Sequence, residues 1–369
     1  MTILVLSSHT PSLFWFRMDM MQAFRAKGVK VVAVGSESNP SWAQKFSETG
    51  IEYRCIPVSR NGINVLADIE TYKSLKKLIK ELNPQKIFTY QAKTIVYGSL
   101  AAHSVDPRIE VYPLVAGLGS IFRGKGLKNS IIRIILNIQY RIAFNYSKKV
   151  IFQNKDDQAE LVNRHLLQRD KCRIIHGSGV NIDKFEMTKL PNEKSMLFIG
   201  RLIGDKGIRE YLELAKRLRS SHTEIKCMLV GPFDSNPSAI SREELQPYID
   251  SNIIEYYGEQ KDVRPFLQQC SVYVLPSYHE GTPKTVLEAM SIGRPIVTTD
   301  APGCRETVLD GINGYLVPIK NVEALYNSVC KILDNPSLAE AFSIQSRRIA
   351  EEKYNVNKIN SDIIKIMDL

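Results

Sequence analysis

The sequence has no long hydrophobic run and no closely spaced cysteine pair. Its six cysteines include no Cys-x-x-Cys arrangement, so we expect buried thiols in a reducing compartment rather than disulfides or a zinc site. No uninterrupted apolar stretch approaches the roughly 18 to 20 residues that span a bilayer. The apolar start, Thr2 to Ser7, lacks a basic leader and a small-residue cleavage site. We therefore expect it to be a first buried strand and not a signal peptide.

Acidic residues are scarce in the first half of the chain. Residues 1–190 carry 28 basic and 15 acidic side chains and residues 191–369 carry 21 and 24, so the net charge of +10 comes from the first half. Between Val111 and Lys155 there are eight Lys or Arg and no Asp or Glu. This asymmetry indicates that one half faces a polyanion, either nucleic acid or an anionic membrane.

Two domains of the α/β class are expected, because 369 residues exceed what one hydrophobic core usually organises. Short β-rich runs alternate with helical patterns, which is typical of parallel sheets with helices on both faces. The alternation restarts after residues 189–192, so we expect Rossmann-like domains at 1–190 and 191–354. A C-terminal helix at about 355–369 is expected to pack back on the first domain.

The predicted elements follow the same alternation in both halves. Strands are expected at 2–6, 30–34, 52–57, 86–90, 110–114, 149–153 and 173–175, and then at 195–199, 226–230, 253–257, 272–275, 295–298 and 315–318. Helices are expected at 14–27, 66–82, 155–167, 207–219, 262–268, 283–292 and 322–333. The loops that follow the strands are the places to look for a ligand site, because open α/β sheets bind ligands at the carboxyl ends of their strands.

A glycine-bounded turn follows the first strand of the second domain. It reads Gly200-Arg201-Leu202-Ile203-Gly204-Asp205-Lys206-Gly207 and leads into a predicted helix. The glycines allow close backbone approach, Arg201 can bind oxygens bidentately and Lys206 acts as a point charge. The turn favours a diphosphate as its ligand. The structural alternative is a solvated turn before a helix.

A longer motif, Pro276 to Met290, follows an apolar strand. Pro283 fits the first turn of a helix, so the amides of residues 282–285 predict an anion site reinforced by the helix dipole. Glu280 precedes this helix, where its carboxylate can accept hydrogen bonds from sugar hydroxyls. Glu288 lies about one and a half turns into the helix, within reach of ribose hydroxyls. Two surface acids near a helix are the alternative interpretation.

The second domain resembles the retaining GT-B glycosyltransferases, in the large family (family 4-like) that includes many bacterial polysaccharide enzymes. Besides the two motifs above, the resemblance rests on Asp300-Ala301-Pro302-Gly303-Cys304-Arg305-Glu306 and Asp310-Gly311-Ile312-Asn313-Gly314. It implies the GT-B fold, two Rossmann-like domains with a cleft between them. It also implies transfer of a sugar from a nucleotide diphosphate, expected to be UDP, with retention at the anomeric carbon.

The resemblance also assigns roles. Arg201 and Lys206 would bind the donor diphosphate and Glu280 the donor sugar, and these three are the predicted catalytic residues. Glu288 would bind the ribose. The remaining predicted donor-binding residues are Gly200, Gly258, Val263, Gly281, Thr282, Pro283, Lys284 and Gly303, with segment 258–263 bordering the base. No metal or other cofactor is expected, because the cations and the helix end neutralise the leaving group.

The first domain has Ser7-Ser8-His9-Thr10-Pro11 where many family members have a Gly-Gly pair. Its stretch Val115 to Ser120 resembles the Gly-Leu-Gly loop of enzymes that extend undecaprenyl-diphosphate-linked sugars, including those that add N-acetylgalactosamine. The candidates for the acceptor side are therefore Gly117 and Gly119, with His9, Lys93 and His103. For each of the last three, a structural role is the alternative.

An isoleucine-rich helix is predicted at 127–146, inside the acid-free segment. With Lys125, Lys128 and Arg133 beside or within it, the pattern predicts an interfacial helix attracted to anionic lipid. A buried helix with basic ends is the alternative. The first interpretation makes the protein a cytoplasmic enzyme, peripheral on the inner face of the plasma membrane. Its partners would be a nucleotide sugar, a lipid-linked saccharide acceptor and the anionic membrane surface.

Other classes of function explain fewer of these features. A nucleotide-sugar epimerase of related fold would need acids placed to move a sugar proton, and a glycosyltransferase with a soluble acceptor would not need the basic helix. A nucleic-acid binder would account for the basic half. However, the basic run has no recognisable nucleic-acid motif and no row of stacking aromatic residues, so no nucleic-acid partner is expected.

Overall fold

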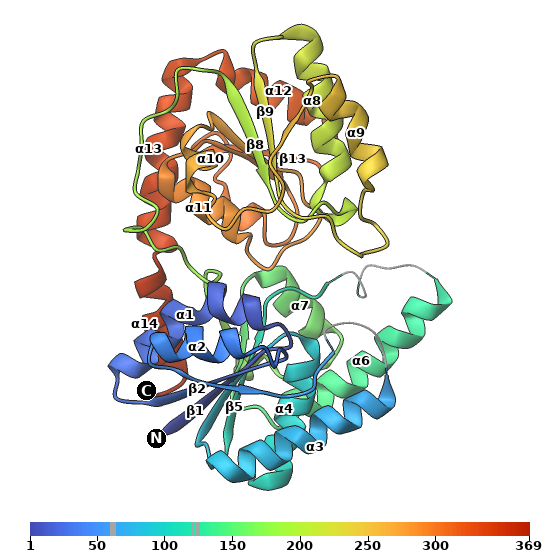
Figure 1. Cartoon of the computed structure of the whole chain (residues 1–369), viewed down its shortest axis with the longest axis vertical. Coiled ribbons are helices and arrows are strands. Elements are labelled where there is room, and N and C mark those ends of the chain that lie inside the picture. The colour runs from blue at the N-terminus through green and yellow to red at the C-terminus, as the bar shows by residue number, and fades with distance from the viewer. Residues whose placement is uncertain (60–63, 120–121, 123–125) are drawn as a thin grey trace. The chain divides into compact units, whose positions relative to one another are not determined.

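The computed structural model describes residues 1–59, 64–119, 122 and 126–369, with the backbone alone at 127 and 128. The chain divides into two compact units (Figure 1). Unit 1 comprises Met1–Ser178 and Val356–Leu369, and unit 2 comprises Gly179–Asn355. Each unit has its own parallel sheet and hydrophobic core, so the expected pair of Rossmann-like α/β domains is confirmed.

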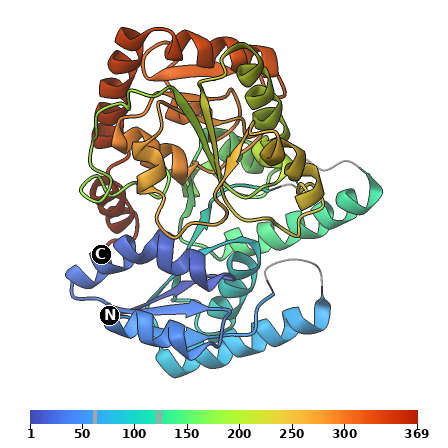
Figure 2. The ribbon, with the colours of Figure 1, turned by 45° about the horizontal axis from the view of Figure 1, so that its top comes forward.

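The strands described in unit 1 form a parallel sheet in the order β3-β2-β1-β4-β5-β6-β7. They are β1 Thr2–Leu6, β2 Lys30–Gly35, β3 Glu52–Cys55, β4 Lys86–Tyr90, β5 Glu110–Val115, β6 Val150–Phe152 and β7 Cys172–Ile174. The helices described are α1 Thr10–Ala26, α2 Pro40–Glu48, α3 Val65–Leu82, α4 Ala92–Val105, α6 Leu127–Asn145, α7 Lys155–Asn163 and α14 Val356–Ile366, and Arg169–Lys171 forms a short 3-10 turn, η1. Figure 2 shows these strands between layers of helices.

Successive residues of the central strands in unit 1 enter opposite layers of the core, as a strand covered on both faces requires. In β1, Ile3 and Val5 pack with residues of α1, α2 and α14. Leu4 and Leu6 pack instead with residues of α3 and α4. The near-continuous apolar sequence of β1 therefore follows from burial on both sides.

The strands described in unit 2 form a parallel sheet in the order β10-β9-β8-β11-β12-β13. They are β8 Ser195–Ile199, β9 Lys226–Val230, β10 Glu255–Tyr256, β11 Val272–Leu275, β12 Ile296–Thr299 and β13 Gly314–Val317. The helices described are α8 Ile208–Ser221, α9 Arg242–Asp250, α10 Arg264–Gln268, α11 Lys284–Ile292, α12 Val322–Leu333 and α13 Pro336–Lys353, with 3-10 turns η2 Gly204–Lys206 and η3 Arg305–Thr307.

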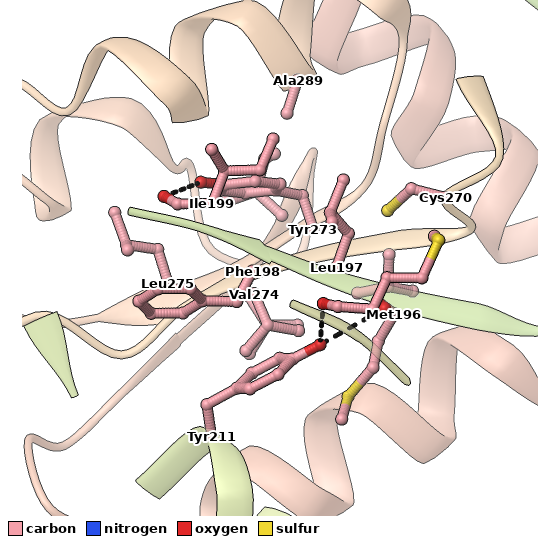
Figure 3. Packing of buried hydrophobic residues seen from close by; sticks show 14 of the residues in the cluster. Met196, Leu197, Phe198, Ile199, Tyr211, Cys270, Tyr273, Val274, Leu275 and Ala289 are labelled. Carbon is pink, nitrogen blue, oxygen red and sulfur yellow. Dashed lines mark hydrogen bonds between the residues drawn. The ribbon is translucent and has the colours of Figure 1, made fainter. Parts of the chain in front are cut away.

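Two fully buried tyrosines hold the centre of the unit 2 core (Figure 3). The Tyr211 hydroxyl, from α8, lies 2.7 Å from the Met228 carbonyl and 3.3 Å from the Met196 carbonyl. The Tyr273 hydroxyl, from β11, lies 3.2 Å from the Ile199 carbonyl. Because both hydroxyls have acceptors, each ring is buried without leaving a polar atom unpaired. These bonds hold α8 against β8 and β9, and they hold β11 against the end of β8.

The boundary between the units lies earlier than the sequence analysis placed it, at Ser178–Gly179 and not near residue 190. Val180 and Phe185 belong to the core of unit 2, and the Val180 amide donates to the Tyr354 carbonyl at 2.8 Å. The stretch at 189–192, which contains a lysine and a proline, resembles a linker in the sequence. The structure shows that the chain enters unit 2 before this stretch.

The last helix, α14, belongs to unit 1. Its residues Ile359 and Ile363 are buried in the same cluster as those of α1 and α2. The Lys86 ammonium, in β4, donates to the Met367 carbonyl at 2.6 Å. None of the helices in the described part of the chain is long and apolar enough to cross a membrane.

Candidate active site

The loops after β8 and β11 meet at the carboxyl edge of the unit 2 sheet, because these two parallel strands are neighbours. The strand order reverses between them, with β9 and β10 beyond β8 and with β12 and β13 beyond β11. Open α/β sheets bind ligands in the crevice at such a switch point. The Gly200–Gly207 turn and the Pro276–Pro283 loop therefore lie at the position where this fold forms a site.

Lys206 and Glu280 form an ion pair between these two loops. Their side chains are 22% and 12% exposed, respectively. The Ser277 hydroxyl lies 2.8 Å from the same Glu280 oxygen, and the Tyr278 amide donates to the Asp205 carbonyl at 2.9 Å. The backbone and side-chain bonds together hold the cation and the acid at one place, although 74 positions separate them in the chain.

Arg201, the second predicted cation, pairs with an acid from a third loop. Its guanidinium lies 2.9 Å from the Asp234 carboxylate, which follows β9. The Arg201 side chain is 41% exposed, so it is accessible to a ligand. The second Asp234 oxygen accepts the Asn236 amide at 2.8 Å, and this bond orients the carboxylate that positions Arg201.

Helix α11 begins directly after the Glu280 loop, as the motif predicted. Pro283 is its N-cap and not its first helical residue, because the Pro283 carbonyl already accepts the amides of Val286 and Leu287 at 3.1 and 3.3 Å. The prediction for Pro283 is thus wrong by one position. A proline N-cap offers no side-chain acceptor to the first amides, so an anion can take that place, with Gly281, Thr282 and Lys284 beside it.

Glu288 is buried in α11, with only 8% of the residue exposed. Burial raises the pKa of its carboxyl to about 7, while Lys284 and Lys184 oppose the rise and Asp262 adds to it. Asp262 belongs to the predicted base segment, which runs from Gly258, with φ of +68°, to Val263. The structure therefore brings this segment within electrostatic range of Glu288.

Two glycines allow the site loops to touch. At Gly207, φ is +73° and a Cβ would lie 2.1 Å from the Pro276 carbonyl oxygen. At Gly303, φ is +79° and a Cβ would lie 2.2 Å from the Glu280 carbonyl oxygen. Any side chain at either position would push two site loops apart. At Gly200, directly after β8, φ is conventional and an added Cβ would lie 3.3 Å from the Phe198 ring.

The carboxyl edge of unit 1 is organised by a residue that the sequence analysis did not single out. Gln91, after β4, has φ of +76°, and its Oε1 accepts from the Ser8 amide at 2.8 Å and lies 3.0 Å from the Ser7 hydroxyl. His9 is the N-cap of α1, where its Nδ1 accepts the Ser12 amide at 3.3 Å. The segment from Ser7 to Pro11 is therefore only partly a loop, because α1 begins at Thr10 and not at Phe14.

The other predicted residues of unit 1 are spread over several environments. Lys93 forms a 2.6 Å ion pair with Asp68, which joins α4 to α3, and His103 stacks on Tyr146 with ring centroids 3.7 Å apart. Both contacts support the structural alternative. Gly117 and Gly119, with φ of +122° and +71°, follow β5. Lys125 lies outside the described residues, and the side chain of Lys128 is not described.

Helix α6 has one exposed and one buried face. Tyr140, Ala143 and Phe144 are buried in a cluster with residues of α4, whereas Arg133 is half-buried. The exposed large apolar residues of the helix are isoleucines at helical spacing: Ile131 51%, Ile134 59%, Ile135 41%, Ile138 57% and Ile142 39%. The helix is therefore not simply a core element. We call these five residues the isoleucine stripe.

Asp234 is a site residue that the sequence analysis missed, and Ser277 lies inside the predicted motif but was given no role. Asp234 comes four residues after β9 and Ser277 two residues after β11, so the rule of examining strand ends would have found both. In the part of the chain that the structure describes, no cluster of three His, Cys, Asp or Glu could hold a metal ion.

Two family models match the chain. The model described as glycosyl transferases group 1 matches residues 180–349, in unit 2, and the model described as glycosyl transferase 4-like matches residues 2–154, in unit 1. With the two Rossmann-like units, these matches define the class of the protein. The chain is a glycosyltransferase with the GT-B fold, made of a glycosyl transferase 4-like domain and a glycosyl transferases group 1 domain.

The chain is also similar to individual enzymes. The chain is 29% identical to N,N'-diacetylbacillosaminyl-diphospho-undecaprenol alpha-1,3-N-acetylgalactosaminyltransferase of Campylobacter jejuni, over 100% of this chain and 98% of the relative. It is 23% identical to UDP-Gal:alpha-D-GlcNAc-diphosphoundecaprenol alpha-1,3-galactosyltransferase of Escherichia coli, over 85% and 82% of the two chains. The crystal structure of Anabaena HepE in complex with UDP and glucose has a TM-score of 0.78 at 16% identity, covering 100% and 99% of the chains, and shows the fold alone.

Proposed function

We propose that the protein is a retaining glycosyltransferase that moves a hexose or N-acetylhexosamine from a UDP-sugar to a polyprenyl-diphosphate-linked saccharide. The product would belong to O-antigen, capsule or glycoprotein glycan assembly. The observation that carries the proposal is the Lys206–Glu280 pair at the switch point of unit 2, with Glu280 in the loop that leads into α11, the helix that carries buried Glu288. The acceptor class rests on the undecaprenol-linked substrates named for the Campylobacter and Escherichia relatives.

The negative charge of the donor diphosphate matches the positive charge that this sheet edge offers. Arg201 and Lys206 would bind the diphosphate, and the first amides of α11 would bind a phosphate oxygen along the helix dipole. The buried Glu288 carboxylate can accept from both ribose hydroxyls, and segment 258–263 would border the uracil. UDP is the proposed nucleotide, since the donor named for the Escherichia relative is UDP-Gal.

The proposed reaction proceeds on one face of the sugar. The bond between the anomeric carbon and the diphosphate oxygen breaks, and the bond to the acceptor oxygen forms on the same face. The proton of the acceptor hydroxyl passes to the departing diphosphate oxygen. Arg201, Lys206 and the start of α11 would stabilise the charge on the leaving group, which is commonly worth about 3 kcal/mol per donor. No metal is then required.

Glu280 is proposed to hold the sugar and not to attack it. Its carboxylate is already engaged by the Lys206 ammonium and lies 2.8 Å from the Ser277 hydroxyl, and these contacts lower its nucleophilicity. The neighbouring Cys304 thiol is also a poor nucleophile. Its burial, with the nearby Glu280, raises its pKa to about 12, which leaves almost no thiolate near neutral pH.

The acceptor adds a requirement for membrane contact, because a polyprenyl tail stays in the bilayer. The isoleucine stripe on α6 offers an exposed apolar face in the acid-free segment Val111–Lys155. We place this face against the anionic inner leaflet of the plasma membrane, where nearby Lys and Arg each contribute about 1 kcal/mol. The enzyme would thus act as a peripheral protein on the cytoplasmic side.

A donor panel tests the proposal directly. The purified protein is incubated with UDP-hexoses and UDP-N-acetylhexosamines, first alone and then with an undecaprenyl-diphosphate-linked saccharide in detergent. We expect slow release of UDP from one donor, faster release with the acceptor, and an α-linked product from an α-linked donor by NMR. An inverted linkage, or turnover of none of the donors, contradicts the proposal; EDTA should leave the rate unchanged.

A further inference from the structure

A cavity of about 660 Å³ lies in unit 1, between the end of α6, the end of α7 and the turn η1. Both helices run back from the carboxyl edge of the sheet, since α6 leads into β6 and α7 into β7. The cavity is therefore at the amino edge of the strands, at the opposite edge from the loops after β1, β4 and β5. Nothing in the proposed sugar transfer uses it.

The rim of the cavity is basic. Arg141, His165, Arg169 and Lys171 line it, and none of the described residues that line it is acidic. The Arg141 guanidinium donates to the His165 carbonyl at 3.2 Å, and the Lys171 ammonium donates to the Asn145 carbonyl at 2.8 Å. These bonds hold two cations in place without neutralising them. Burial lowers the pKa of the Lys171 ammonium, although Asp170 beside it opposes the change.

The floor of the cavity is apolar and continues onto the isoleucine stripe. Phe144 and Leu166 are buried, and Val162 and Leu167 are half-buried. Ile142 lines the cavity and is also the last residue of the stripe. An apolar chain lying along α6 would therefore pass directly from the stripe into the cavity.

We propose that this cavity binds one anionic phospholipid from the membrane. The lipid phosphate would lie between Arg141, Arg169 and Lys171, and an acyl chain would run over Ile142 onto the isoleucine stripe. The inference rests on the proposed function, because the enzyme works at a bilayer only if its acceptor is lipid-linked. The inference adds a discrete lipid site, which would hold the C-terminal end of α6 against the leaflet.

Short-chain lipids test the site without a bilayer. Dihexanoyl phosphatidylglycerol, kept below its micelle concentration, is titrated into the full-length protein by calorimetry. Dihexanoyl phosphatidylcholine has the same chains without the net charge, and inorganic phosphate has the charge without the chains. We expect saturable binding of one phosphatidylglycerol and much weaker binding of the other two probes.

Matched variants assign the binding to the cavity. Arg141→Gln with Arg169→Gln should weaken phosphatidylglycerol binding about tenfold or more, because two cations beside the phosphate are lost. Lys27→Gln with Lys45→Gln removes the same charge from two exposed positions, one directly after α1 and one in α2, and should leave the affinity unchanged. Circular dichroism and thermal melting verify that all variants fold.

Several results would overturn the lipid site. Equal binding of phosphatidylcholine would show that charge is not recognised, and equal binding of inorganic phosphate would identify a free-anion site. A dimer in sedimentation that Arg141→Gln with Arg169→Gln dissociates would show that a second copy covers the cavity. Lipid binding without sugar transfer to any lipid-linked acceptor would refute the proposed function alone, and transfer without lipid binding would refute the site alone.

Discussion

Arg201 and Lys206 are both predicted to bind the diphosphate, but the structure gives them different partners. Lys206 shares its charge with Glu280, which is also proposed to touch the sugar, whereas Arg201 is oriented by Asp234. A diphosphate at Lys206 would therefore also change the charge balance at Glu280. This coupling links donor binding to the placement of the reacting sugar.

Removal of either cation should slow turnover. Arg201→Ala and Lys206→Ala should each reduce kcat/KM about a hundredfold or more, through lost stabilisation of the leaving group. Steady-state rates of UDP release measure this. Exposed Arg242→Ala, at the start of α9, is the control and should stay within about twofold of wild type. Near-normal rates for both site variants would place the diphosphate elsewhere.

Substitutions of the two acids of the motif should affect different kinetic constants. Glu280→Gln should reduce kcat strongly, because the carboxylate touches the reacting sugar, whereas Glu288→Gln should mainly raise the KM for the donor. UDP affinity measured by calorimetry completes the comparison. The assignment fails if Glu288→Gln lowers kcat while leaving UDP affinity intact.

Glu288 should also make stability depend on pH. Its carboxyl pKa is raised to about 7 by burial, so between pH 4.5 and 7 the folded chain holds a proton that the unfolded chain has lost. The free energy of unfolding contributed by Glu288 therefore falls as pH rises through this window, by about 3 kcal/mol in all.

Denaturant unfolding of wild type and Glu288→Gln at several pH values measures this contribution. From pH 4.5 to 7, the free energy of unfolding of Glu288→Gln should rise relative to that of wild type. If the difference between the two free energies did not change with pH, Glu288 would be ionised and well solvated in the folded chain. Because ribose hydroxyls stabilise the carboxylate, UDP binding near pH 6.5 should also release a proton, which calorimetry in buffers of different ionisation enthalpy detects.

At the scale of elements, α6 combines a buried face on α4 with an exposed apolar stripe. Ile138→Ser should weaken binding to vesicles of anionic lipid several-fold, because an isoleucine that is 57% exposed would leave the bilayer interface. Ile344→Ser, at a 51% exposed isoleucine of α13 in unit 2, is the matched control. Vesicle sedimentation measures the binding. If both variants lost the same amount of vesicle binding, α6 would not be the membrane-contacting element.

The bounds of several strands were predicted best from the sequence. Segments β1, β8 and β9 coincide with the expected ranges, because strands buried on both faces give compact apolar runs. The helix starts were less predictable, as α1 and α11 show. His9 and Pro283 occupy N-cap positions although neither is among the usual capping residues. The His9 side chain accepts the Ser12 amide, whereas Pro283 makes no side-chain cap bond.

At the scale of the whole molecule, the two units have separate cores. Saturating UDP should therefore raise the thermal transition of unit 2 selectively, by about 2.7 kcal/mol of stability at a hundredfold excess over Kd. Differential scanning calorimetry of the full chain, with adenosine diphosphate as the control nucleotide, tests this. A shift of unit 1 alone would move the nucleotide site to the other sheet.

The sequence by itself determined the class of fold, the two switch-point motifs and the basic, acid-free segment, because each depends on residues close together in the chain. Tertiary structure decided the rest. The pairing of Lys206 with Glu280, the partner of Arg201 and the burial of Glu288 all depend on segments that are distant in the chain. The exposure of the isoleucine stripe was undecidable for the same reason, since an amphipathic pattern does not say which face the neighbouring helices will cover.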